Sequence, residues 1–527
     1  MRRSILLPLL VVAAAAPARA QEPPPEAAAP TTESAAPAAP AGSARVLRLH
    51  VADVGRLALR NSPRFRALAL EPSIARTFVD EARGEFDPLV GARLTGGRTR
   101  SEVFFSPGSF GGGSDFAVDE TWRGNVGVTG VAEWGGAWSA SYDATSTSHG
   151  GASSIASLAP RYDGLLSLGY VHPLLRGAGR DVRLSHVREA ERRTSASESQ
   201  LARAAELTVA EAESLYWDLV SAIADRDVLL TSRALALELL DVARARVDAG
   251  RGIPADVAEA EAGLARRDGE LIDAEARIGN LADRLRELVL PFGGPEGDLD
   301  LLVQPADTAP QTTGDAPADP GRELLESALA RRGDVQAAVE ALGAAQLAER
   351  RLRNAAQIEL NALVNGGLTG MGSGVRDAAR QIGDGEDYRW EAGLEVAIPL
   401  CNVAEDARLL RAERETARAE REVAAARNSA VRDVREAVRN VRAALERIAA
   451  AERERVATEA QLAAERSRLE QGKSTPFLVL EVEEDRSRAV ASQTRARTDL
   501  AKAHVALDAA LGGLLERRGL VEAAAGE

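Results

Sequence analysis

The side chains that most often carry chemistry in proteins are few in this sequence and form no motif. No histidine stands at a metal-ligand spacing from cysteine, aspartate or glutamate. The sequence also has no P-loop, no nucleophile elbow and no dinucleotide fingerprint. We therefore predict no catalytic residue, no cofactor and no metal site, so the protein is not an enzyme and depends on a partner for energy. The side chains concerned are His50, His149, His172, His186, His504 and Cys401.

Carboxylates are the other chemical candidates. Glu483 and Glu484 are adjacent, but they lie in a charge-rich helical stretch, where we expect them to belong to a solvated face. The formal net charge of -14 argues against nucleic acid as a partner. A single cysteine permits no intramolecular disulfide, so stability must come from packing and assembly.

The beginning of the chain predicts export. Arg2 and Arg3 precede an apolar run, and Ala18 and Ala20 supply the small residues of a cleavage site, so residues 1–20 read as a signal peptide. Residues 21–43 are rich in proline and alanine and predict a disordered linker. No later apolar run reaches the ~18 residues of a membrane-spanning helix, so any membrane span would have to be a β-barrel.

Two regions alternate polar and apolar residues with the period of two that indicates strands, residues 86–175 and 358–400. Gly135 and Gly136 suggest a hairpin turn, and we expect extended loops at 101–120 and 371–388. Together these regions predict about four long strands. Four tryptophans in them suit a membrane interface, namely Trp122, Trp134, Trp138 and Trp390.

The rest of the chain predicts long helices. A kinked or two-piece helix at 51–83 is interrupted near Pro63 and Pro72. Two long antiparallel hairpins follow, at 184–290 and 404–515. The second carries an apolar seam at alternating spacings of three and four, formed by Val431, Val434, Val438, Val441, Leu445 and Ile448.

The order of elements occurs twice. Ala58–Ala67 parallels Ala328–Ala337, 270 positions later, whereas Val247–Val257 parallels Leu469–Val479, 222 positions later. The first strand region must therefore be longer by about 48 residues. In each half, the first helix and the helix after the turn are each about half as long as the helix between them, so stacked end to end they would match it, about 100 Å.

These observations predict a mainly α protein with membrane β-strands, built from two structural repeats. The first repeat spans 44–290 and the second 321–515, with a Pro/Gly-rich linker at 291–320 and a C-terminal tail at 516–527. The smallest closed membrane barrels need about eight strands, so about four strands per chain could form one only if several copies share it.

The chain resembles the TolC-like outer membrane factors, the outer membrane efflux protein family, along nearly all of its mature length. The resemblance rests on the order and duplication of its motifs: ALRNSPRFRA, GEFDP at Gly84–Pro88, HPLLRGAGRD at His172–Asp181, LYWDL at Leu215–Leu219, ARRGDVQAA, AIPL at Ala397–Leu400 and the two glycine turns.

The resemblance implies a homotrimer with a twelve-stranded β-barrel in the outer membrane of a Gram-negative bacterium, in contact with outer-membrane lipid. A twelve-helix α-barrel would continue it across the periplasm. Such a protein is the exit channel of a tripartite efflux or type I secretion system. It receives small molecules or proteins from an inner-membrane transporter through a periplasmic adaptor.

The resemblance also implies two functional places at the hairpin turns. The tips would contact the adaptor through Gly250, Pro254, Val257, Gly472, Pro476 and Leu480. Asp256 and Glu481 would face the narrowed pore, where a ring of carboxylates attracts cations. Leu478 departs from the family pattern, in which a second acidic residue is common there.

Two other functions stay open on sequence alone. An elongated periplasmic adaptor should show one helical hairpin between halves of a lipoyl-like module, whereas this chain shows two hairpins and two strand regions. A structural coiled-coil spacer would carry the same heptads, which by themselves do not exclude it.

Overall fold

The structure is a computed structural model that describes residues 46–103, 115–150, 161–250, 252–290, 302–310, 320–471, 473–474 and 476–524. The predicted signal peptide at 1–20, the linker at 21–43, most of the linker at 291–320 and the tip residue Gly472 lie outside these ranges. Residues 46–527 form one compact unit.

The first helical segment is divided into three helices: α1 (Val51–Asn61), α2 (Pro63–Ala69) and α3 (Glu71–Gly84). Proline suits the first turn of a helix because it has no amide hydrogen to donate there, and both α2 and α3 carry one in that turn. The Ser62 hydroxyl accepts a hydrogen bond from the Phe65 amide, which caps α2. The two breaks lie at the prolines where the sequence predicts interruptions, and they divide the predicted kinked or two-piece helix into three pieces.

Two helices of more than 60 residues, α5 (Ser185–Asp248) and α10 (Val403–Glu470), organise the helical part. The short α4 (Arg180–Arg183) precedes α5, and α7 (Arg322–Arg331) and α8 (Gly333–Ala355) precede the second strand region. After the turns come α6 (Pro254–Val289) and α11 (Pro476–Ala510).

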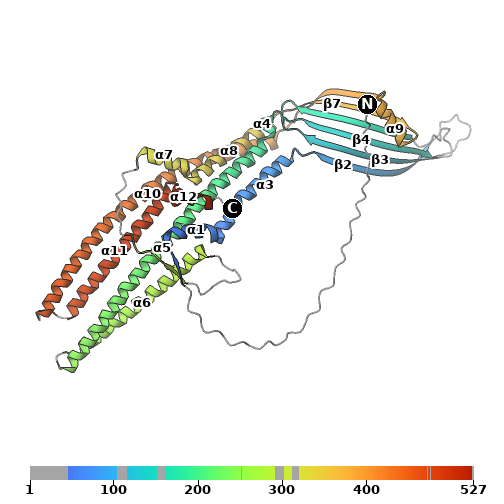
Figure 1. The fold of residues 1–527 in the computed structure, drawn as a ribbon. Coiled ribbons are helices and arrows are strands. Elements are labelled where there is room, and N and C mark those ends of the chain that lie inside the picture. The colour runs from blue at the N-terminus through green and yellow to red at the C-terminus, as the bar shows by residue number, and fades with distance from the viewer. Residues whose placement is uncertain are drawn as a thin grey trace, which may run out of the picture. The chain divides into compact units, whose positions relative to one another are not determined.

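The shorter helices pack side by side along the two long helices, α5 and α10. Both α3 and α6 pack on α5, and both α8 and α11 pack on α5 and on α10, as the predicted end-to-end stacking requires (Figure 1). The α10 seam is buried as expected, with Val434, Val438 and Val441 at most 1% exposed. None of the described helices combines the length and apolar character needed to cross a bilayer.

Two small features are not predicted from the sequence. Strand β1 (Val46–Leu49) pairs in parallel with β6 (Leu302–Pro305), which falls inside the expected linker at 291–320. The expected tail at 516–527 overlaps α12 (Leu514–Arg518) and includes α13 (Val521–Ala524), both of which pack on α5. The part of the tail that the structure describes thus belongs to the core, because Leu520 and Ala524 bury their side chains there.

The strands form one antiparallel sheet of six, in the order β2-β3-β4-β5-β7-β8. The prediction of about four strands is wrong, because residues 86–175 hold two hairpins rather than one. The turn between β3 and β4 occurs at the predicted glycines, where Gly135 has φ +108°. The strands are β2 (Leu89–Val103), β3 (Asp115–Val131), β4 (Ala137–Gly150), β5 (Arg161–Pro173), β7 (Glu359–Gly372) and β8 (Tyr388–Ala397).

The predicted loop at 371–388 contains a helix, α9 (Val375–Asp384). It packs on β5 and β7 through the buried Ala378 and Ile382. Glycine permits this contact, because a Cβ on Gly370 would lie 2.1 Å from the Ala378 carbonyl oxygen. The spacing of four between these two apolar residues was the sequence signal for the helix.

Candidate functional site

The strand register gives the sheet two chemically different faces. On one face, which we call the apolar face, large hydrophobic side chains are left uncovered within one chain. Leu94 exposes 74% of its surface, Leu168 63% and Trp390 74%. This face carries Val90, Ala92, Leu94, Trp122, Val126, Val128, Trp138, Ala140, Tyr142, Leu166, Leu168, Tyr170, Val364, Leu368, Trp390, Ala392, Leu394 and Val396.

The opposite, polar face carries hydrogen-bonded polar side chains. Asn125 donates to the Asp143 carboxylate at 2.6 Å, Ser141 donates to it at 3.1 Å, and the hydroxyls of Ser141 and Ser167 lie 2.9 Å apart. This face is therefore suited to water. Its polar residues include Arg93, Thr95, Thr121, Arg123, Asn125, Ser139, Ser141, Asp143, Thr145, Asp163, Ser167, Asn365, Arg389, Glu391 and Glu395.

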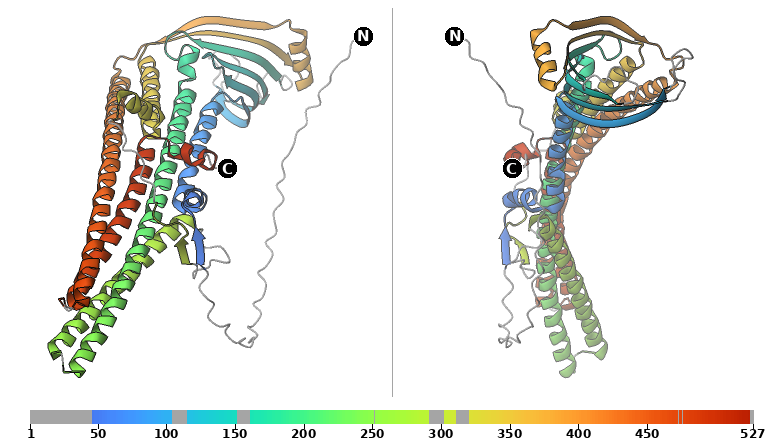
Figure 2. Two further views of the ribbon diagram at one scale, coloured as in Figure 1. Left: turned by 60° about the vertical axis from the view of Figure 1, so that its left-hand side comes forward. Right: turned by 90° about the vertical axis from the view of Figure 1, so that its right-hand side faces the viewer.

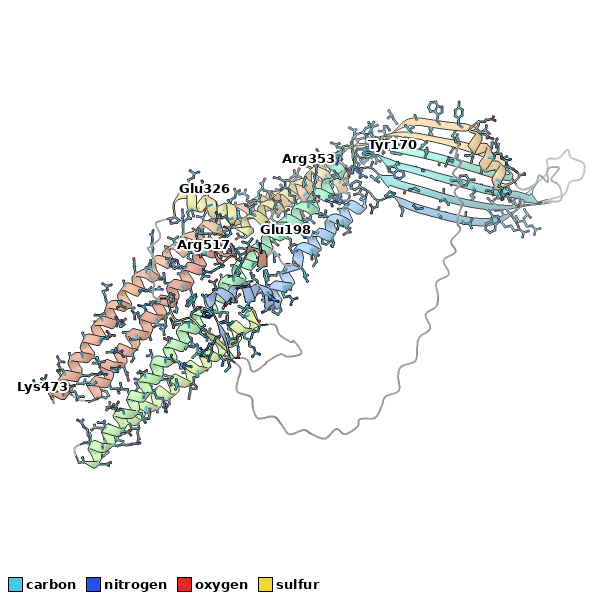
Figure 3. The ribbon with its side chains drawn as sticks, in the orientation of Figure 1. Tyr170, Glu198, Glu326, Arg353, Lys473 and Arg517 are labelled. Atoms are coloured by element: carbon cyan, nitrogen blue, oxygen red, sulfur yellow. The ribbon has the colours of Figure 1, made fainter. Side chains whose placement is uncertain are left out.

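Aromatic side chains mark the end of the sheet that adjoins the helices. Figure 3 places Tyr170 at this junction. The Trp134 indole donates to the Tyr170 hydroxyl at 2.9 Å, and His172 lies 3.2 Å from the same oxygen with its ring stacked on the tyrosine ring. An indole and a phenol with satisfied polar atoms suit the boundary between lipid and water.

The hairpin of α5 and α6 turns as the sequence predicts. Gly250 has φ +67°, which ends α5, and Pro254 opens α6. Asp256 is exposed, and its carboxylate accepts a hydrogen bond from the Ile253 amide at 3.3 Å. Val257 is half-buried. Asp256 therefore caps a helix in the isolated chain, a local role that does not prevent its carboxylate from facing a shared pore.

The second turn lies between α10 and α11. The Lys473 amide donates to the Arg468 carbonyl at 2.8 Å, and the Ser474 hydroxyl donates to Glu465, which lowers the pKa of that carboxyl. Pro476 opens α11, Leu480 is half-buried and Glu481 is exposed. Figure 3 shows Lys473 at the end of the helices farthest from the sheet, and both turns lie at that end (Figures 1 and 2).

The expectation that Glu483 and Glu484 belong to a solvated face is wrong. The Glu483 side chain is 8% exposed and accepts from Arg466 at 3.1 Å and from Arg486 at 3.0 Å. Glu484 pairs with Arg267 of α6, whose side chain is 9% exposed. These pairs link α11 to α10 and to the other hairpin, and the sequence held no signal that these distant helices meet.

A titratable cluster ties the start of α1 to the segment after β6. The Asp307 carboxylate lies 2.8 Å from His50 Nδ1, from the Val51 amide and from the Tyr216 hydroxyl. Burial acts to raise the pKa of Asp307, but hydrogen bonds from Val51, His50 and Tyr216 outweigh it and hold this pKa below its usual value. The hydrogen bond between His50 and Asp307, together with the negative charge of that carboxylate, raises the pKa of His50. Burial raises the pKa of Tyr216.

We expect the contact between β1 and β6 to be strongest between about pH 4 and pH 6.5. Because the pKa of Asp307 is lowered, its stabilisation is present above the unfolded value and is lost as the pH falls. Because the pKa of His50 is raised, its stabilisation is lost as the pH rises through the folded value.

Hydrogen exchange of the Val46–Leu49 amides measures this contact. The Asp307→Asn variant should raise the exchange rate of these amides about tenfold at pH 6, because it removes a charged acceptor that has three donors. It should also remove the increase in their exchange that we expect when the pH falls and Asp307 is protonated. Exchange that is equally pH-dependent in the variant would contradict this assignment. Asp80→Asn, which removes an exposed carboxylate on α3, is the control.

Comparison with known proteins supplies the family context. Residues 324–513 match the model of the outer membrane efflux protein family, which confirms the resemblance seen in the sequence. No curated protein matches the chain. Within the described residues, no three histidine, cysteine, aspartate or glutamate side chains gather as a metal site.

Several solved structures share the fold. A membrane protein from Pseudomonas aeruginosa is 18% identical, with 92% of this chain and 97% of that chain covered and a TM-score of 0.63. The CmeC outer membrane channel of Campylobacter jejuni is 15% identical, with coverages of 88% and 86% and a TM-score of 0.62. The outer membrane protein VceC of Vibrio cholerae is 17% identical, with coverages of 88% and 96% and a TM-score of 0.59.

Proposed function

We propose that this chain, whose residues 324–513 match the outer membrane efflux protein family, is one protomer of a trimeric exit channel in a Gram-negative outer membrane. Its sheet contributes to a shared β-barrel, and its helices contribute to an α-barrel that crosses the periplasm. Small molecules or proteins enter from an inner-membrane transporter through a periplasmic adaptor. The chain is a conduit in this assembly and performs no chemistry.

The observation that carries the proposal is the two-faced sheet. Covering a large apolar side chain is worth about 1.5–3 kcal/mol, so a face that leaves Leu94, Leu168 and Trp390 mostly exposed needs an apolar environment. In the part of the sheet nearer the helices, apolar and polar residues alternate along the strands, which is the pattern of a barrel wall with lipid outside and water inside. The strands have 10 to 17 residues, enough to cross a bilayer at a tilt.

The helices support assembly rather than a solitary chain. At each level they form one layer, either α3, α5, α8 and α10 or α6, α5, α11 and α10. Such a layer leaves its two lateral edges open, and three copies side by side would give the twelve helices of a closed tunnel. At its far end the tips would meet the adaptor through Gly250, Pro254, Val257, Gly472, Pro476 and Leu480.

The first test is conductance of the purified oligomer in a planar bilayer. We expect a large pore, because both barrels would enclose water. If Asp256 and Glu481 form the constriction, Asp256→Asn with Glu481→Gln should lower the cation-to-anion permeability ratio at least about twofold. Asparagine keeps an acceptor for the Ile253 amide, so the cap of α6 is preserved.

The matched control removes the same charge away from the tips. Glu275 and Glu420 are exposed on α6 and α10, and Glu275→Gln with Glu420→Gln should leave the permeability ratio unchanged. An equal change in both double variants would refute the constriction. The absence of any conductance, even in the unmodified oligomer, would refute the channel itself and favour the structural spacer.

A further inference from the structure

The two halves of the chain follow the same order from the first helices to the hairpin turns, but the first half has the longer strand region. Helices α2 and α8 begin at Pro63 and Gly333, 270 positions apart. Strands β4 and β7 begin at Ala137 and Glu359, only 222 positions apart. Strand β7 also begins 270 positions after β2, at Glu359 against Leu89, so it matches either β2 or β4. The first half holds four strands where the second half holds two, so the difference of about 48 residues amounts to one extra hairpin, and β2 with β3 is the hairpin at the free edge of the sheet.

The extra hairpin belongs to the sheet. Strand β3 pairs with β4 without a break from Val118 to Val131, and β2 pairs with β3 along its full length. Near the helical end its residues also follow the two faces, with Leu94 on the apolar face and Arg93 on the polar face. Each chain therefore supplies six strands to the sheet, four from its first half and two from its second. A chain without the extra hairpin would supply four.

The sheet ends in two open edges. Within the described residues, β2 pairs only with β3 and β8 pairs only with β7. Six alternating strands leave β2 and β8 antiparallel, so β8 of one copy can pair with β2 of the next and continue the alternation around a ring. An unpaired edge inside a lipid layer would leave its backbone polar groups without partners, which a membrane does not tolerate.

The geometry selects one register for this pairing. Following the observed pairs across the sheet from Leu89 leads to Glu391, six residues before Ala397. If Leu89 pairs with Ala397 of the next copy, the beginning of β2 and the end of β8 are level at the helical end, and the stagger is one residue per strand. That stagger corresponds to a strand tilt of about 35°, within the range of membrane barrels.

The same register matches the side chains. It places Leu89 and Ala397 on the same face, as pairing requires. On the polar face Arg93 lies opposite Gly393, with Glu391 and Glu395 diagonally on either side. Opposite charges at diagonal positions stabilise a strand pair.

We propose that β2 and β8 of successive copies pair in this register, so that the trimer closes a barrel of eighteen strands. The inference rests on the proposed function, because it takes from it that three copies assemble. It adds the number of strands in the barrel and therefore the width of the outlet. For a spacing of about 4.8 Å and this tilt, eighteen strands give a backbone radius of about 17 Å, against about 11 Å for twelve. The two additional strands of each chain widen the outlet.

The register predicts a disulfide between copies. Gly91 and Glu395 would lie directly opposite each other on the polar face, at a Cα separation that suits a disulfide. In a Cys401→Ser background, Gly91→Cys with Glu395→Cys should give covalent dimers and trimers at least tenfold above Gly91→Cys with Ala392→Cys, whose second position faces the other way.

Removal of Glu85–Ala132, which joins Gly84 to Glu133, directly tests the number of strands in the barrel. Electron microscopy should show eighteen strands in the full chain and twelve in the shortened one. A conducting oligomer without the Gly91–Glu395 link, or with twelve strands in the full chain, would overturn this inference and leave the proposed function standing. Full chain that neither oligomerises nor conducts would overturn the proposed function, and the inference with it.

Discussion

Replacing Leu168 by arginine should reduce the assembled oligomer in the outer-membrane fraction at least tenfold. Leu168 lies near the middle of β5 on the apolar face, with 63% of its surface exposed. A lipid-facing arginine near the bilayer midplane costs about 2–4 kcal/mol. In the proposed trimer this penalty would occur three times, once in each copy.

The adjacent residue provides the control. Ser167 points to the polar face, where its hydroxyl lies 2.9 Å from that of Ser141, so Ser167→Arg loses one hydrogen bond but places its charge in water. Its yield of oligomer should remain within about twofold of the unmodified protein. Equal loss in the two variants would show that strand pairing, and not lipid contact, limits assembly. Leu168→Phe, which keeps the face apolar, should be tolerated.

The helical part of this fold is predicted well from sequence because its signals are local. Glycine and proline mark both hairpin turns, as Gly250 and Pro254 show, and the spacing from Val434 to Val441 marks the buried stripe of α10. The register shift between the halves also located the extra segment. What it did not reveal was the nature of that segment, because β2 interrupts its alternation with three glycines and three arginines.

The remaining differences concern contacts between distant segments. Glu484 forms an ion pair with Arg267 of another helix. The sequence around Glu484 does not differ from that of a carboxylate exposed to water, so the pair could not be predicted locally. Likewise β1 and β6 are four residues each and stabilise one another only as a pair. The pore-facing role of Asp256 and Glu481 depends on neighbouring copies, so neither the sequence nor the single chain determines it.

Replacing Arg518 by alanine should release the C-terminal segment from the helical layer. Arg518 of α12 donates two hydrogen bonds of 2.8 Å to the Glu213 carboxylate of α5. The Glu213 side chain is only 1% exposed, and this hydrogen bonding raises the pKa of Arg518. Removing the arginine leaves a buried carboxylate without its charged partner, which costs about 3 kcal/mol. Amide exchange across residues 514–524 should then rise roughly a hundredfold.

Two further variants separate the buried charge from a general weakening of α12. Glu516 lies on the same helix, but its ion pair with Arg331 is exposed, so Glu516→Ala should raise exchange by less than about fivefold. Glu213→Leu combined with Arg518→Met removes both charges and fills the space, and should restore slow exchange because no buried charge remains unpaired. Fast exchange in that double variant would mean that the ion pair itself, with its two directed hydrogen bonds, holds α12 on α5.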